Sequence, residues 1–338
     1  MVRVIQNFFL RTLIVAFWIF VIVLFLFLPR FTKLFMTEKS ITIFTFPLLL
    51  DAEYVSEFEM RTGVKIHIHY YETNDGLLAK LRSTDQHGYD IIFPSDYVVE
   101  QLIKEDKLQK LDHSRLDFLD RLNPKLLGLY YDPRNEYATP YLWEAYGIGF
   151  DKAYFDGKIP EASWKLIFDE KVSPPHIGML NNAREAVSLA GLYLFGTNEN
   201  LNQKQLEKIQ ELLIKQKNRV SVYTDLRGDY LLLSKTCSVI ACPAGDVWMA
   251  ENTQIEFLQP KEGGFVTVDN VCIPKSCTNV DLVYQFINYL YEPNVVKHHS
   301  DKYFFFPASP PVPFVGRGQQ VMEKTLSEFE KFRFLVPK

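Results

Sequence analysis

The fold is decided by the stretch Ile41-Thr42-Ile43-Phe44-Thr45-Phe46 and by the chain that follows it. This run of β-branched and aromatic residues is typical of a buried strand, and Pro47 ends it. Asp51 is the predicted cap of a helix that runs to Gly63, a residue suited to the left-handed position after a helix end. The segment 64–71 then alternates apolar with polar residues, which predicts a second strand.

The same order repeats further along the chain. Asn74 is the predicted cap of a helix over 75–83, a third strand covers 89–94, and a third helix covers 97–105. Strand–helix–strand–helix order predicts a parallel sheet with crossover helices, so the fold class is α/β. Later helices are predicted at 163–168, 182–195, 202–217, 280–291 and 323–334, and later strands at 146–150, 237–241 and 270–273.

Composition excludes one class of partner. Of the 338 residues, 47% are hydrophobic and 23% are charged, which is an ordinary globular balance. The net charge is -4, whereas a phosphate-binding surface needs an excess of Lys and Arg. We therefore expect no nucleic acid as the main partner.

The N-terminus carries sixteen consecutive apolar residues, Leu13 to Leu28, preceded by Arg3 and Arg11. Two interpretations remain open, a cleaved signal peptide and an uncleaved signal-anchor. No small-residue cleavage motif follows the run, which favours the anchor. In both cases the chain from Thr37 onward lies outside the cytoplasm, periplasmic and, with an anchor, tethered to the inner membrane.

Several short motifs follow one another in a recognisable order. They are Thr62-Gly63-Val64-Lys65-Ile66, Tyr71-Glu72-Thr73-Asn74, Tyr89-Asp90-Ile91-Ile92-Phe93-Pro94-Ser95, Tyr137-Ala138-Thr139-Pro140-Tyr141-Leu142-Trp143, Ala183-Arg184-Glu185 and Pro260-Lys261-Glu262-Gly263-Gly264. Together these motifs resemble the polyamine-binding (spermidine/putrescine-binding) branch of the periplasmic solute-binding proteins of ABC transporters, over the chain from about Ile41 to Pro310.

The resemblance implies a two-lobed binding-protein fold with a ligand cleft and a hinge, preceded by an N-terminal hydrophobic helix at 1–39. One lobe is expected to comprise 40–144 with 269–315, and the other 145–268 with 316–338. The chain would cross between them near Trp143 and Asp269. Such proteins are not enzymes. They pass a small solute to a membrane permease, so we expect no catalytic residue, metal site or cofactor.

The resemblance also implies the ligand-binding residues. Ser95, Tyr97, Glu185 and Asp269 match the family's hydroxyl-bearing loop and its amine-binding acids. The set is completed by three replaced positions: Phe46 for a Trp, Phe306 for a Tyr and Asn182 for an Asp.

Other positions depart from the family. Leu48 and Leu49 replace an acid and a tyrosine, and Cys242 and Thr267 replace tryptophans. These changes predict a cleft with fewer charges, which favours a diamine over a triamine. The acids Asp96, Glu144 and Asp246 lie next to matched positions. They are interpreted as solvated carboxylates at the rim of the cleft. The alternative is that they lie in the cleft and restore the negative charge lost at the replaced positions.

Some features stay outside this assignment. Cys237, Cys242, Cys272 and Cys277 form two C-x4-C pairs, compatible with one or two disulfides or with buried free thiols. His298 and His299 are interpreted as residues at a helix end. Two alternative functions remain: the same fold binding a different small polar solute, or a membrane-anchored two-lobed enzyme or sensory module.

Overall fold

A computed structural model describes residues 13, 16–19, 21–23, 39–85, 88–225, 227–309 and 317–327. The predicted membrane segment Leu13 to Leu28 lies largely outside this set, and its few described residues are helical. Within the described residues, the helices are all too short or too polar to span a bilayer.

One mixed sheet organises the molecule, in the order β2-β1-β3-β9-β4-β7-β5-β6 with β8 and β10 also paired to β4. The strands are β1 (Ser40–Thr45), β2 (Lys65–Tyr70), β3 (Ile91–Ile92), β4 (Ala138–Asp151), β5 (Ile177–Met179), β6 (Val220–Tyr223), β7 (Val239–Pro243), β8 (Ile255–Leu258), β9 (Val266–Cys272) and β10 (Phe306–Pro307). As predicted, β1 pairs in parallel with β2 and β3, whereas β9 joins β3 and β4 antiparallel.

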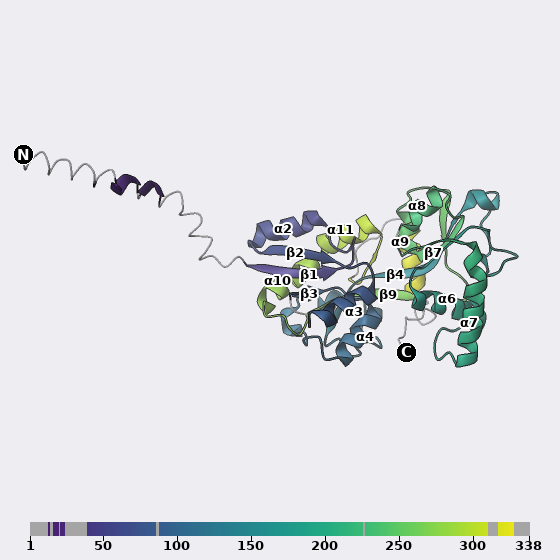
Figure 1. The fold of residues 1–338 in the computed structure, drawn as a ribbon, viewed down its shortest axis with the longest axis horizontal. Coiled ribbons are helices and arrows are strands. Elements are labelled where there is room, and N and C mark those ends of the chain that lie inside the picture. The colour runs from purple at the N-terminus through teal and green to yellow at the C-terminus, as the bar shows by residue number, and fades with distance from the viewer. Residues whose placement is uncertain are drawn as a thin grey trace, which may run out of the picture.

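Helices cover both halves of the sheet (Figure 1). They are α2 (Ala52–Thr62), α3 (Asn74–Ser83), α4 (Asp96–Lys104), α5 (Lys165–Phe168), α6 (Ala183–Phe195), α7 (Gln203–Gln216), α8 (Gly228–Leu233), α9 (Ala244–Trp248), α10 (Val280–Leu290), α11 (Pro293–Tyr303) and α12 (Arg317–Ser327). Asp51 caps α2 through the backbone N–H of Glu53, and Gly63 ends it at φ 71°, as predicted. The predicted cap of α3 is wrong by one residue, because Thr73 accepts from Gly76 while Asn74 is already helical.

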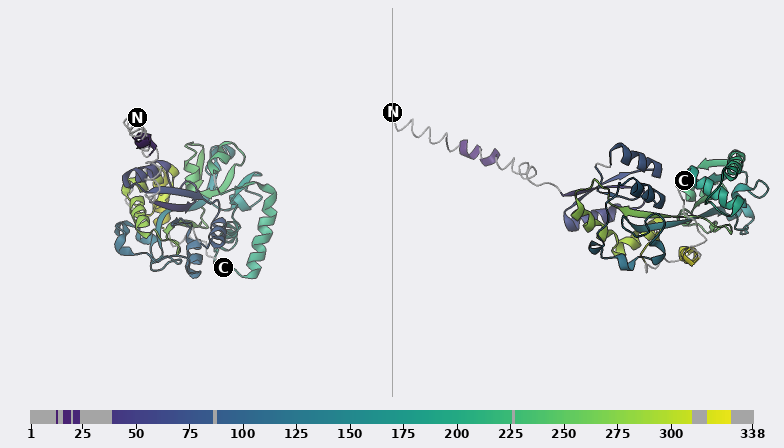
Figure 2. Two further views of the ribbon diagram at one scale, coloured as in Figure 1. Left: turned by 60° about the vertical axis from the view of Figure 1, so that its left-hand side comes forward. Right: turned by 90° about the horizontal axis from the view of Figure 1, so that it is seen from below.

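The two halves of the molecule are joined by two long strands (Figures 1 and 2). β4 pairs with β9 up to Ala145 and with β7 from Tyr146 onward, so a single strand belongs to both halves. The buried Trp143 lies just before this change of partner and packs against Phe306, with ring centroids 4.5 Å apart. The crossing strands thus run along the floor between the halves.

Two features left open by the sequence are settled by the packing. All four cysteines are buried free thiols. The interpretation of His298 and His299 as helix-end residues is wrong, because both lie inside α11 with their rings against Asp51.

Candidate functional site

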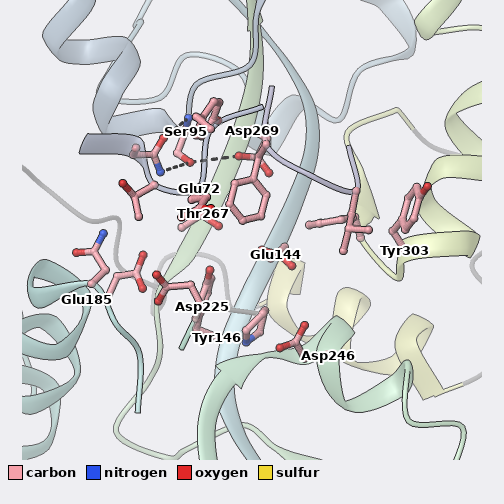
Figure 3. Close-up of a pocket in the computed structure, with 18 of the residues that line it drawn as sticks. Glu72, Ser95, Glu144, Tyr146, Glu185, Asp225, Asp246, Thr267, Asp269 and Tyr303 are labelled. Carbon is pink, nitrogen blue, oxygen red and sulfur yellow. Dashed lines mark hydrogen bonds between the residues drawn. The ribbon is translucent and has the colours of Figure 1, made fainter. Parts of the chain in front are cut away.

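A cleft of about 820 Å³, open solvent at its mouth included, lies over the crossing strands. Both halves of the molecule line it, as Figure 3 shows. The lining residues are Phe46, Leu48, Tyr71, Glu72, Thr73, Asn74, Ser95, Glu144, Tyr146, Asn182, Glu185, Asp225, Pro243, Asp246, Met249, Thr267, Asp269, Tyr303 and Phe305.

The ionisable side chains that line this cleft are acidic. Among the residues that the structure describes, its lining includes no Lys, Arg or His but six carboxylates: Glu72, Glu144, Glu185, Asp225, Asp246 and Asp269. They come from separate elements of the chain, and the fold brings them together in the cleft. A concentration of carboxylates without a counter-ion in the same lining favours a cationic ligand.

Asp269 is held by a short polar chain on the first half of the sheet. Ser95, the residue before α4, donates its hydroxyl to Asp269 Oδ1 at 3.2 Å. Asn74 donates its side-chain amide to Ser95 Oγ at 3.0 Å. This chain fixes the orientation of one Asp269 oxygen and leaves the carboxylate on the cleft wall (Figure 3).

Glu185 and Asp225 form the acidic wall of the opposite half. Glu185 lies in the first turn of α6, and Asn182 caps this helix by accepting from the N–H of Arg184 at 2.9 Å. Asp225, just after β6, accepts from the backbone N–H of Asn181 at 2.8 Å. The Asn182 cap and the hydrogen bond from Asn181 to Asp225 therefore place both carboxylates on the same side of the cleft.

Burial raises the pKa of three of these acids. It raises the pKa of Asp269 to about 7, against the hydrogen bond from Ser95. Burial and the neighbouring Asp225 raise the pKa of Glu185 to about 8. Burial likewise raises the pKa of Asp246 to about 7. A bound cation would favour the ionised forms, so binding of a cation here would release protons.

Aromatic rings complete the walls between the acids. Phe46 lies against Tyr71, with ring centroids 5.9 Å apart, and Tyr146 stacks on Phe265 at 4.2 Å. Tyr303 and Phe305 line the cleft near α11. Rings of this kind suit both the methylene groups and the positive charge of an organic cation.

A family model described as "Bacterial extracellular solute-binding protein" matches residues 53–315. The chain belongs to this family. Its relatives include the putrescine-binding periplasmic protein PotF of Escherichia coli, 30% identical over 292 residues that cover 80% of this chain and 78% of the relative. Another is the spermidine/putrescine-binding periplasmic protein of Salmonella typhimurium, 29% identical over 245 residues, with 72% and 70% covered.

Solved structures agree with this assignment. A putative spermidine/putrescine ABC transporter protein from Listeria monocytogenes superposes with a TM-score of 0.76 at 25% identity, covering 88% of this chain and 92% of that one. The Tp0655 lipoprotein of Treponema pallidum, 21% identical, shares the fold with a TM-score of 0.72, covering 86% and 99%. The predicted two-lobed binding-protein fold is confirmed.

Five of the seven residues predicted to bind ligand line the cleft of this solute-binding protein: Phe46, Ser95, Asn182, Glu185 and Asp269. Two do not. Tyr97 is buried in α4, and its ring is covered by the guanidinium of Arg184, 4.9 Å from the ring centroid. Phe306 is buried against Trp143, and its neighbour Phe305 lines the cleft in its place.

The interpretation of three acids as solvated rim carboxylates is wrong. Glu144 and Asp246 line the cleft. Asp96 lies fully buried behind it, where one oxygen accepts from the Tyr130 hydroxyl at 3.2 Å. Asp225 and Tyr146 were missed altogether. Asp225 lies beyond a short strand that the sequence did not predict, while Tyr146 was assigned to a strand without a side being assigned to its ring.

Proposed function

We propose that this protein captures a polyamine, such as putrescine or spermidine, in the cleft and delivers it without turnover to the membrane permease of an ABC transporter. The observation that carries the proposal is a cleft lining with six carboxylates and, in the described part of the chain, no basic side chain. Each ammonium group needs carboxylates to replace its lost water, and the aromatic walls suit the methylenes between them. The relatives that bind putrescine or spermidine by name support the same ligand class.

A single metal ion suits this cleft less well. Metal ions need several ligand atoms converging on one point. Among the described residues, three potential ligands within 4.8 Å of one another occur at Asp51, Glu53 and His298, none of which lines the cleft. Carboxylates distributed along the cleft favour a ligand whose positive charges are distributed too.

We propose that Ser95, Asn182, Glu185 and Asp269 hold the ligand polar groups and that Phe46 packs against its chain. The lobes would be 40–144 with 269–315, and 145–268 with 316–338, closing over the ligand by hinge motion. The change of β4 partner at Ala145 and Tyr146 supports this division. Small-angle scattering checks it, because an unchanged radius of gyration on saturation with ligand would contradict closure.

A thermal-shift screen of the protein with polyamines, amino acids, iron complexes and phosphorylated compounds tests the ligand class. A ligand that binds only the folded state raises the melting temperature by mass action, by about 2.7 kcal/mol of stability at a hundredfold excess over Kd. We expect putrescine or spermidine to give the largest shift. A shift with another compound and none with polyamines would assign a different small polar solute.

We also propose a periplasmic location with a tether through Leu13 to Leu28. The apolar run without a small-residue cleavage motif and the extracellular character of the family support it. Intact-mass measurement on protein from native membranes checks the tether, and a mature N-terminus near residue 35 would contradict it.

A further inference from the structure

Glu144 differs from the other cleft acids in the strand that carries it. It lies on β4 opposite Thr267 of β9, immediately before Ala145, the last residue paired with β9. From Tyr146 onward the same strand pairs with β7. Glu144 therefore lies at the joint between the two halves of the sheet. Asp269 lies on the other crossing strand, β9, which pairs with β3 and β4, and the remaining four cleft acids lie off the two crossing strands.

The surroundings of Glu144 are acidic from both directions. In Figure 3 it lies between Asp269 on β9 and Asp246 on α9. Burial first, and then the charges of Asp269, Asp246 and Glu185, raise its pKa well above the usual range. The other titratable groups that interact with it are Tyr146 on β4 and Cys242 on β7, both neutral when protonated.

We propose that Glu144 is a cation-binding residue of the cleft, and that an ammonium group bound beside it is shared with acids of both halves, which couples capture of the ligand to closure. This inference rests on the proposed function. Without a cation, ionisation of Glu144 is opposed by its burial and by the charges of Asp269 and Asp246. A cation placed among the three attracts each carboxylate, which offsets their mutual repulsion and favours the ionised forms.

Glu144→Gln tests this, because it keeps the shape of the side chain and removes its charge. The probes are putrescine and spermidine, titrated calorimetrically at pH 8 in two buffers of different ionisation enthalpy. A charge-assisted hydrogen bond predicts a loss of affinity of about tenfold or more. We also expect fewer protons released per ligand bound, and a smaller ligand-induced decrease in the radius of gyration.

Glu207→Gln is the matched control, since it removes the same charge from an exposed side chain of α7 that does not line the cleft. Its affinity should stay within about fivefold of the wild type, because exposed charges are screened. Equal losses in the two variants would show that the position of Glu144 on the crossing strand is immaterial, which overturns the inference.

Failure of the inference and failure of the proposed function are distinguishable. If the wild type binds either amine and Glu144→Gln binds it equally well, the inference alone is overturned. If the wild type binds neither, both are overturned. A measurement without ligand adds a separate test: at pH 8 the empty Glu144→Gln protein should melt at a higher temperature than the wild type, and a lower melting temperature would contradict the assigned environment.

Discussion

Asp51 and Asp269 are both substantially buried carboxylates, but the chain treats them in opposite ways. Asp51 forms an ion pair with Lys302, accepts from His298 at 2.9 Å, and caps α2. Burial opposes its ionisation, yet these donors outweigh burial and hold its pKa well below the usual range. Asp269 receives one hydroxyl hydrogen bond, from Ser95, and burial raises its pKa to about 7.

The difference separates a carboxylate whose countercharge is built into the fold from one proposed to meet its countercharge in the ligand. Asp51 finds its countercharge in the same chain, on α11. The cleft acids have none among the residues that line the cleft. Burial therefore favours the protonated forms of Asp269, Asp246 and Glu185 in the empty protein, and under the proposed function the ligand brings the positive charge that favours the ionised forms.

The sharpest way to break this comparison is to neutralise the cleft acids singly. Glu185→Gln and Asp269→Asn should each weaken putrescine and spermidine by roughly tenfold to a hundredfold, because each removes a charge-assisted hydrogen bond of about 1.5–3 kcal/mol. Calorimetric titration measures the effect. Neither variant should lower the melting temperature of the empty protein, since each removes a buried acid that lacks a cationic partner in the cleft lining.

Asp132→Asn is the matched control for this prediction. Asp132 is a buried acid whose Oδ2 accepts from the backbone N–H groups of Tyr137 and Ala138 at 2.7 and 3.0 Å. It does not line the cleft. Its variant should keep the affinity of the wild type. An equal loss of affinity in Asp132→Asn would mean that overall charge, rather than position in the cleft, attracts the ligand.

The pH dependence of stability gives the next largest effect. An acid whose pKa rises on folding stabilises the protein fully below its unfolded pKa, about 4, and this contribution is lost as the pH rises through the folded pKa. For Asp269, Asp246 and Glu185 the folded values are about 7, about 7 and about 8. The melting temperature of the empty protein should therefore fall between pH 5.5 and pH 8.5.

Saturating putrescine should reduce this fall, because the bound cation favours the ionised acids. Differential scanning calorimetry with and without ligand measures both slopes. A melting temperature of the empty protein that rises over this pH interval would contradict the raised pKa values of the cleft.

The sequence predicts those features of the fold and the cleft that depend on residues close together in the chain. Asp51 and Gly63 were identified as helix boundaries because a cap needs only its own helix. Glu185 and Asp269 were identified through motifs, and both line the cleft. Asp225 was not, because its position depends on β6, a four-residue strand whose pairing with β5 is a long-range event.

The choice of Phe306 over Phe305 shows a second limit. Three phenylalanines follow one another, and sequence alone does not fix which one faces the cleft. Phe304 takes a left-handed conformation at φ 59°, ending α11, and β10 then pairs Phe306 with Trp143. A single residue of register decides the side on which each ring lies, as it does in any strand. Glu144 was misjudged for a related reason, since the side of β4 that faces the cleft is set by its pairing with β9.

Asp51→Asn tests the carboxylate that has its countercharge within the fold, and it should give the smallest effect. The amide keeps an oxygen for the cap of α2 but loses the ionic part of the interaction with Lys302. Because Lys302 is about half exposed, its contribution is partly screened, and we expect a loss of about 1–2 kcal/mol of unfolding free energy at pH 7. Urea denaturation measures it, and the affinity for putrescine should not change.

The stability that Asp51 contributes is present above its unfolded pKa and is lost as the pH falls below about 4, so the variant and the wild type should converge there. This is the opposite direction to the cleft acids. A variant that lost affinity while keeping its stability would place Asp51 in the binding site and dissolve the distinction between the two kinds of carboxylate.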